Sequence, residues 1–205
     1  MKVLNLYSGI GGNRKLWQNV EVTAVEQNAK IAEIYSDFFP NDNIIIGDAH
    51  EYLIKHFAEY DFVWTSPPCP THSRLRTLQQ NIVYPDMRLY SEILVLQNFA
   101  KGFYVVENVL PYYEPLIKPQ ILHRHAFWTN FQLHYKEFPK LKTCKIGKER
   151  EVLQNATGFN LDKYTGVDKR LLLRNAVLPE LGQHVFNCAL RKVPPIQEGL
   201  FGTDS

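Results

Sequence analysis

Two apolar runs, each followed by residues that end a strand, constrain the fold of this chain most strongly. Residues 62–64 (Phe-Val-Trp) lead into a proline-rich stretch that holds Cys69, and residues 103–106 (Phe-Tyr-Val-Val) lead directly into Glu107. Continuous apolar runs bounded by turn residues are typical of parallel strands that are buried on both faces. Open α/β sheets hold their ligands at the carboxyl ends of such strands. We therefore expect the Cys69 thiol and the Glu107 carboxylate to share one cleft.

A thiol and a carboxylate in one cleft suit a specific chemistry. C5 of cytosine is too electron-poor to attack a methyl donor, but a thiolate that adds at C6 makes C5 nucleophilic. A carboxylic acid at N3 favours this addition because it neutralises charge that develops in the ring. The chain resembles the DNA (cytosine-5) methyltransferases, whose Pro-Cys and Glu-Asn-Val motifs appear as Pro68-Cys69 and Glu107-Asn108-Val109.

The resemblance extends from residue 3 to about residue 190, and it implies a fold, a cofactor and a reaction. The implied fold is α/β, a Rossmann-like S-adenosylmethionine-dependent methyltransferase fold with a small recognition insert. The implied reaction transfers a methyl group from S-adenosylmethionine to C5 of a cytosine flipped out of DNA, through a covalent intermediate. Cys69 is then the nucleophile and Glu107 the partner of N3. Asn108 fixes the surroundings of that carboxylate through backbone hydrogen bonds.

A glycine-rich turn after the first expected strand marks the cofactor site. Residues 3–7 are typical of a strand, residues 8–12 (Ser-Gly-Ile-Gly-Gly) of a turn, and residues 13–17 of the start of a helix. Such turns let the backbone approach a ligand closely and direct free N–H groups at it. Glu26 ends the second expected strand, where a carboxylate suits hydrogen bonds from ribose hydroxyls.

The resemblance adds further residues to this site. It places Gln27 against the adenine and makes Asp48 the acceptor for the adenine amino group, which is compatible with Asp48 also capping a helix. The family's last motif, Gly-Asn-Ala-Val-x-Pro, falls at residues 174–179, with Arg174 in the glycine position. The implied cofactor residues are Tyr7, Ser8, Gly9, Ile10, Gly11, Gly12, Glu26, Gln27, Asp48, Ala49, Pro68, Asn175 and Val177.

The resemblance also implies an arginine at the cytosine carbonyl oxygen. Arg124 is the candidate, although the usual Gln-x-Arg-x-Arg pattern is missing and His125 follows it. The thiol loop departs from the family as well, with Pro70 in place of Gln and His72 in place of Phe. We expect His72 to contact solvent or a phosphate.

Basic residues near the cleft and in a later segment suit a DNA partner. Between residues 134 and 151, six Lys or Arg residues are interleaved with aromatic residues and show little periodicity, as expected of a loop on a nucleic-acid backbone. Cations beside the thiol loop are well placed for phosphates. The expected DNA-contacting residues are Ser73, Arg74, Arg76, Lys140, Lys142 and Lys145.

The expected domain organisation is a catalytic domain with a reduced insert. Residues 1–130 and 171–195 form the methyltransferase domain, residues 131–170 the insert, and residues 196–205 a tail. The insert occupies the place of the family's target recognition domain, which is typically much larger. With fewer groups to reach base edges, the recognised site is short or degenerate, or a partner subunit supplies specificity.

Composition limits the setting. At 205 residues, with 45% hydrophobic and 21% charged residues, the chain suits one globular domain with a proper core, and its net charge of +2 permits a nucleic-acid partner without requiring one. The three cysteines are too scattered for a disulfide framework or a metal site. The N-terminus shows no apolar signal region, and no run reaches membrane-spanning length. A cytoplasmic protein with no membrane partner and no metal is expected.

Two other functions fit parts of the sequence. Ser-Pro-Pro followed by an aromatic residue is the signature of exocyclic-amino (N4-cytosine or N6-adenine) methyltransferases, and Ser66-Pro67-Pro68 precedes Cys69. The chain would alternatively be a catalytically silent DNA-binding subunit that needs a partner. The sequence leaves open the DNA site, the oligomeric state, the biological context, and RNA as a substrate, since related enzymes modify tRNA with the same motifs.

Overall fold

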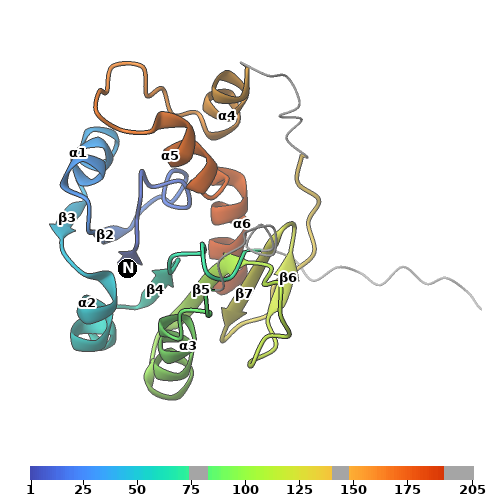
Figure 1. Cartoon of the computed structure of the whole chain (residues 1–205). Coiled ribbons are helices and arrows are strands. Elements are labelled where there is room, and N and C mark those ends of the chain that lie inside the picture. The colour runs from blue at the N-terminus through green and yellow to red at the C-terminus, as the bar shows by residue number, and fades with distance from the viewer. Residues whose placement is uncertain (74–82, 140–147, 192–205) are drawn as a thin grey trace, which may run out of the picture.

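The computed structural model describes residues 1–73, 83–139 and 148–191, which build a seven-stranded sheet with helices on both faces (Figure 1). The strand order is β3-β2-β1-β4-β5-β7-β6. Strands β1 to β5 pair in parallel, whereas β7 runs antiparallel to both β5 and β6. The strands are β1 (Lys2–Leu6), β2 (Glu21–Glu26), β3 (Asn43–Ile46), β4 (Phe62–Thr65), β5 (Phe103–Val109), β6 (Gln120–Leu122) and β7 (His125–Thr129).

Two buried clusters hold the helices against opposite faces of the sheet. The central strand β4 is buried throughout: Phe62 and Trp64 pack with Phe186 of α6, whereas Val63 packs with Leu96 of α3. This alternation is what a strand covered on both faces requires. The helices are α1 (Ala29–Phe38), α2 (Ala49–His56), the 3-10 helix η1 (Phe57–Glu59), α3 (Arg88–Phe99), α4 (Glu149–Thr157), α5 (Lys169–Asn175) and α6 (Pro179–Ala189).

The winding of the chain reverses beside β1, which lies between β2 and β4. Leu6 at the end of β1 pairs in register with Thr65 at the end of β4, so the turn after β1 and the loop after β4 begin side by side. The carboxyl ends of parallel strands at such a switch point are where open sheets bind ligands.

The predicted Rossmann-like α/β fold is confirmed, with local corrections. The helix expected from residue 13 is absent; residues 12–16 form turns, and Trp17 N donates to Arg14 O at 3.0 Å. The short strand β6 and its hairpin with β7 were not predicted from the sequence.

Residues 149–161, in the part of the sequence assigned to the insert, contain a helix and buried side chains that the sequence did not predict. Helix α4 begins at Glu149, and Leu153 and Phe159 share a buried cluster with Ile10 and Ile34 of the sheet-and-helix core. None of the helices in the described residues is long and apolar enough to span a bilayer.

Candidate active site

The thiol loop follows β4 and is closed by its own backbone. His72 N and Ser73 N donate to Cys69 O at 3.0 and 3.1 Å, which makes a tight turn around the cysteine. Burial raises the pKa of the Cys69 thiol, and the nearby negative charge of Glu107 raises it further. The loop therefore holds Cys69 as a neutral thiol, close enough to Glu107 for the carboxylate charge to disfavour the thiolate.

Strand β5 delivers Glu107 and ties the thiol loop to the sheet. Glu107 is buried, with 7% of its surface exposed. The next residue, Asn108, donates from Nδ2 to Pro67 O at 3.0 Å, and its Oδ1 accepts from Val109 N at 2.9 Å. The structure thus brings Cys69, Glu107 and Asn108 together at the carboxyl ends of neighbouring strands.

The side chain that lies against Glu107, within the described ranges, belongs to a histidine to which the sequence motifs give no role. His125 Nδ1 lies 3.2 Å from Glu107 Oε1. The predicted anchor Arg124 is exposed and forms no ion pair with Glu107 in this part of the chain. The two-residue period of a strand points to His125 once the register is known. Phe127 pairs with Glu107, and His125 lies two residues before Phe127, so the His125 side chain is on the same face as the Glu107 carboxylate.

His72 is a second correction, because it is buried and does not face solvent. Its Nδ1 lies 2.6 Å from the hydroxyl of Tyr113, and burial lowers the pKa of the imidazole. Tyr112 N donates to His72 O at 3.1 Å, so this residue joins the thiol loop to the segment after β5. Of the expected DNA-contacting residues, Ser73 lies on this loop in a bridge with Pro111; Arg74, Arg76, Lys140, Lys142 and Lys145 lie outside the described residues.

The glycine turn after β1 is held by Glu26. Gly9 N donates to Glu26 Oε2 at 3.0 Å, and Asn28 N donates to Oε1 at 2.9 Å. Gly9 has a left-handed backbone (φ 52°), and a Cβ built there would meet no atom within 4 Å. The same is true of the space at Gly47, after β3. The turn therefore presents an open backbone beside a carboxylate, which fits an adenosyl group.

The other predicted cofactor residues differ in their burial, and printed contacts fix two of them, Asp48 and Gly12. Asp48 caps α2, accepting from Glu51 N at 3.0 Å, as the sequence allowed. Gly12 packs so closely on the last motif that an added Cβ would lie 2.3 Å from Val177 O. Tyr7, Glu26 and Asp48 are partly buried, Ser8, Ile10, Gly11, Gly12, Ala49 and Val177 are buried, and Gln27, Pro68 and Asn175 are exposed.

A buried carboxylate that the sequence did not single out connects the two loops. Glu92 of α3 is fully buried and accepts from Tyr7 Oη and Thr65 Oγ1, each at 2.6 Å, while His50 Nδ1 lies 3.0 Å away. Burial and the charge of Glu92 raise the pKa of Tyr7. Because Tyr7 follows β1 and Thr65 ends β4, Glu92 fixes the starting points of both the glycine turn and the thiol loop.

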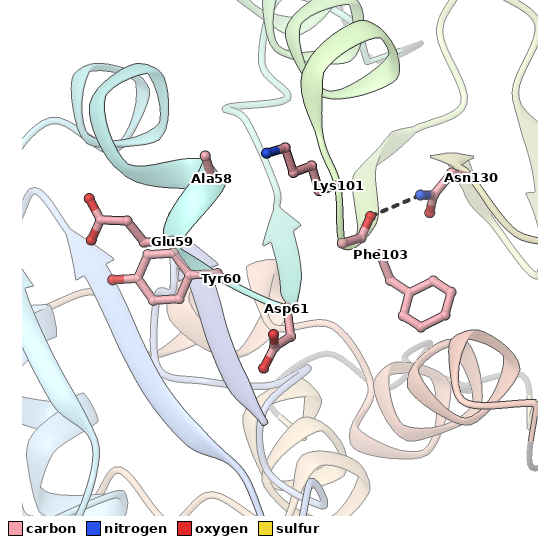
Figure 2. A pocket seen from close by; sticks show the side chains of 8 residues that line it. Ala58, Glu59, Tyr60, Asp61, Lys101, Phe103 and Asn130 are labelled. Atoms are coloured by element: carbon pink, nitrogen blue, oxygen red, sulfur yellow. Dashed lines mark hydrogen bonds between the residues drawn. The ribbon is translucent and has the colours of Figure 1, made fainter.

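A hollow of about 320 Å³ lies at the opposite ends of the strands (Figure 2). Asp61 precedes β4 and Gly102 precedes β5, and Asn130 Nδ2 donates to Gly102 O at 2.9 Å. This hollow is therefore separate from the candidate site at Cys69 and Glu107. No group of three His, Cys, Asp or Glu side chains in the described ranges is placed to hold a metal.

Comparisons with known proteins identify the family and show the same fold. A sequence model of the C-5 cytosine-specific DNA methylase family matches residues 1–111. The structure is similar to that of the Entamoeba histolytica methyltransferase EhMeth, with a TM-score of 0.60, 14% identity, and coverage of 95% of this chain and 99% of that one. It also matches a Spodoptera frugiperda Dnmt2 variant, with a TM-score of 0.38, 28% identity, and coverage of 53% and 35%. A search of curated proteins gave no significant match.

Proposed function

Since this chain belongs to the C-5 cytosine-specific DNA methylase family, we propose that it transfers a methyl group from S-adenosylmethionine to C5 of cytosine in DNA through a covalent bond to Cys69. The observation that carries this proposal is that the Glu107 carboxylate lies close enough to the Cys69 thiol for its charge to raise the pKa of that thiol. A buried thiol with no reaction to perform needs no carboxylate beside it, since that charge only disfavours the thiolate.

The proposed reaction uses the two side chains in sequence. The Cys69 thiolate forms a bond to C6; the C5=C6 electron pair moves to C4–C5, and the C4=N3 pair moves onto N3. N3 accepts a proton by way of Glu107, which leaves an enamine with a nucleophilic C5. S-adenosylmethionine supplies the electrophilic methyl group. The bond from C5 to the methyl group would form as the sulfonium–methyl bond breaks and S-adenosylhomocysteine leaves. Loss of the C5 proton to water and expulsion of the Cys69 sulfur then restore the C5=C6 bond, and the N3 proton returns to Glu107.

The cofactor proposal rests on the open glycine turn. Glu26 accepts from the ribose hydroxyls, Asp48 accepts from the adenine amino group, and Gln27 covers the adenine. The open space at Gly9 and at Gly47, beside Glu26, supports these roles. Asn175 and Val177 complete the pocket from the segment before α6, and the contact of Gly12 with Val177 supports their position.

DNA is the proposed partner, with the target cytosine flipped out because C6 is not reachable in the base stack. Ser73, Arg74, Arg76, Lys140, Lys142 and Lys145 are proposed phosphate contacts. The small insert predicts a short or degenerate recognition site, or a partner subunit that supplies specificity.

Covalent trapping tests the function directly. DNA that contains 5-fluorocytosine blocks the loss of the C5 substituent, so the parent protein with S-adenosylmethionine should form a DNA adduct that survives denaturation. Cys69→Ala should form none. Cys188→Ala is the matched control, because Cys188 is a buried cysteine of α6 that packs against His184, and it should be trapped like the parent.

Each other outcome identifies a different function. Methyl transfer to an exocyclic amino group without an adduct would make the chain an amino methyltransferase. Transfer that begins only after a second chain is added would make it a silent subunit. An adduct with 5-fluorocytosine RNA but not with DNA would replace the proposed substrate.

A further inference from the structure

His125 is placed beside Glu107 by the pairing of two strands. It is the first residue of β7, and it pairs with Val109 while Phe127 pairs with Glu107. Because residues two apart on a strand point to the same face, His125 and Glu107 are diagonal neighbours on one face of the sheet. The antiparallel ladder therefore fixes this imidazole at the carboxylate.

The two side chains form a pair that is mostly removed from water. The exposed fractions of the side chains alone are 18% for His125 and 10% for Glu107. Nδ1 of His125 lies 3.2 Å from Oε1 of Glu107. This is an ion-pair distance without the alignment of a hydrogen bond, and Nδ1 itself is buried. Within the described residues Nδ1 has no hydrogen-bond partner, so the Glu107 carboxylate is the polar group that it faces.

The titratable groups around His125 come from several elements. Glu107 faces it from β5, Cys69 lies on the thiol loop beyond that carboxylate, and the ring of His123 is 6.2 Å away on the turn before β7. Arg124 is adjacent in sequence but exposed. His184 of α6 is more distant, reached through Phe138, which contacts both His123 and His184.

We propose that protonated His125 is the counter-ion of Glu107 during the addition of Cys69 to cytosine, so that the pair is neutral when the thiolate and the ring anion form. This inference rests on the proposed function and assigns a positioning and charge-balancing role to a residue outside its motifs. With His125 neutral and Glu107 ionised, the pair carries one negative charge and no proton that could pass to N3, which opposes both the thiolate and the electron density that moves onto N3. With His125 protonated, that opposition is removed.

The role makes the reaction depend on pH in a specific way. Imidazoles titrate between about pH 5 and pH 8, so the favourable charge is lost as pH rises through that range. The thiolate fraction of Cys69 rises with pH. Between pH 6 and pH 8.5 the rate of adduct formation by the parent should therefore rise less steeply than the thiolate fraction of Cys69, because the charge of His125 is lost over the same range.

Two substitutions separate the charge of His125 from its shape. His125→Gln removes the charge, so the rate at pH 6 should fall about tenfold, while the difference from the parent should shrink towards pH 8.5. His125→Arg keeps a permanent positive charge, so the rate at pH 6 should stay near that of the parent and should exceed it towards pH 8.5, where it follows the thiolate fraction of Cys69 alone. His56→Gln on α2, whose imidazole pairs with exposed Glu59, should leave the profile unchanged.

The measurement is the rate of adduct formation with 5-fluorocytosine DNA from pH 5.5 to 9, with thermal unfolding of each variant as a check of folding. A constant ratio between parent and His125→Gln at every pH would overturn the counter-ion role, as would a His125→Arg protein that is folded but as slow as His125→Gln. If the parent forms no adduct at any pH, the covalent function itself fails and this inference fails with it.

Discussion

At the scale of single residues, the surroundings of Cys69 disfavour ionisation of its thiol. Burial and the Glu107 charge both raise its pKa, so the reactive thiolate is scarce at neutral pH. A cysteine protected in this way reacts slowly with general electrophiles. Reactivity then depends on a substrate or a counter-ion that changes the local charge.

Alkylation of Cys69 provides a test that needs no DNA. Glu107→Gln removes the negative charge that disfavours the thiolate, so the pKa of Cys69 should fall and its alkylation by iodoacetamide at pH 7.5 should accelerate several-fold, up to about tenfold. Methyl transfer by the same variant should fall by about a hundredfold or more, because N3 loses its acid.

Peptide mass spectrometry of the Cys69 peptide, followed over a pH series, measures the first effect. Glu33→Gln, an exposed glutamate on α1, is the control and should leave the midpoint of alkylation where it is in the parent. A midpoint that is equally unmoved in Glu107→Gln would show that the carboxylate does not act on the thiol.

The residues of the chemistry could be predicted from the sequence because they follow apolar runs. Cys69 lies on the loop after β4 and Glu107 lies near the carboxyl end of β5, and the carboxyl ends of parallel strands meet at one edge of a sheet whatever lies between them. His125 was not assigned because its role depends on which residue of β7 opposes Glu107, and that register is set by pairing between segments. Arg124, the residue chosen by its match to a family motif, is exposed, and its role at the cytosine carbonyl oxygen stays a prediction.

At the scale of elements, helix α3 does more than cover the sheet. Its buried Glu92 binds the ends of β1 and β4 through Tyr7 and Thr65, and it meets α2 through His50. A carboxylate with no exposed surface and three polar partners is costly to remove, since each partner is then left without its acceptor.

Glu92→Ala should lower the free energy of unfolding by about 3 to 5 kcal/mol. Urea denaturation followed by circular dichroism measures this change. Glu33→Ala on α1 should change stability by less than about 0.5 kcal/mol, because Glu33 is exposed. Equal stabilities for the two variants would show that Glu92 does not hold the loops together.

The elements that the sequence did not predict share a physical cause. Strand β6 is three residues long, and α4 and α5 have nine and seven, so each presents too few apolar positions for a clear period. The turns at residues 12–16 replace a helix because Gly182 of α6 allows Asn13 to pack against it: a Cβ at Gly182 would lie 2.5 Å from Asn13 O. That contact joins segments far apart in the chain, so no local pattern could show it.

At the scale of the whole molecule, Phe159, which follows α4, is connected to the glycine turn after β1 by packed side chains. Phe159 is fully buried, with its ring 4.8 Å from Phe38 and 6.3 Å from Phe39. Phe39 in turn closes the space at Gly11, where an added Cβ would lie 2.3 Å from its ring. A path of packed side chains therefore runs from residue 159 to the glycine turn.

Phe159→Ala should lower the free energy of unfolding by about 3 to 5 kcal/mol and weaken S-adenosylmethionine binding, because the ring that supports Phe39 is lost. Urea denaturation and calorimetric titration with the cofactor measure the two effects. Leu171→Ala, which truncates an exposed side chain of α5, should change neither by much. Tight cofactor binding by a destabilised Phe159→Ala protein would show that the two regions are independent.

The burial of all three tryptophans gives the molecule a built-in optical reporter. Trp17, Trp64 and Trp128 have at most 4% of their surfaces exposed, so the folded protein should emit at short wavelength and shift to the red on unfolding. Trp64 also donates from Nε1 to Ser66 Oγ at 2.9 Å, three residues before Cys69. In a protein with Trp17→Phe and Trp128→Phe, the fluorescence of that single indole would register a rearrangement of the loop as DNA arrives.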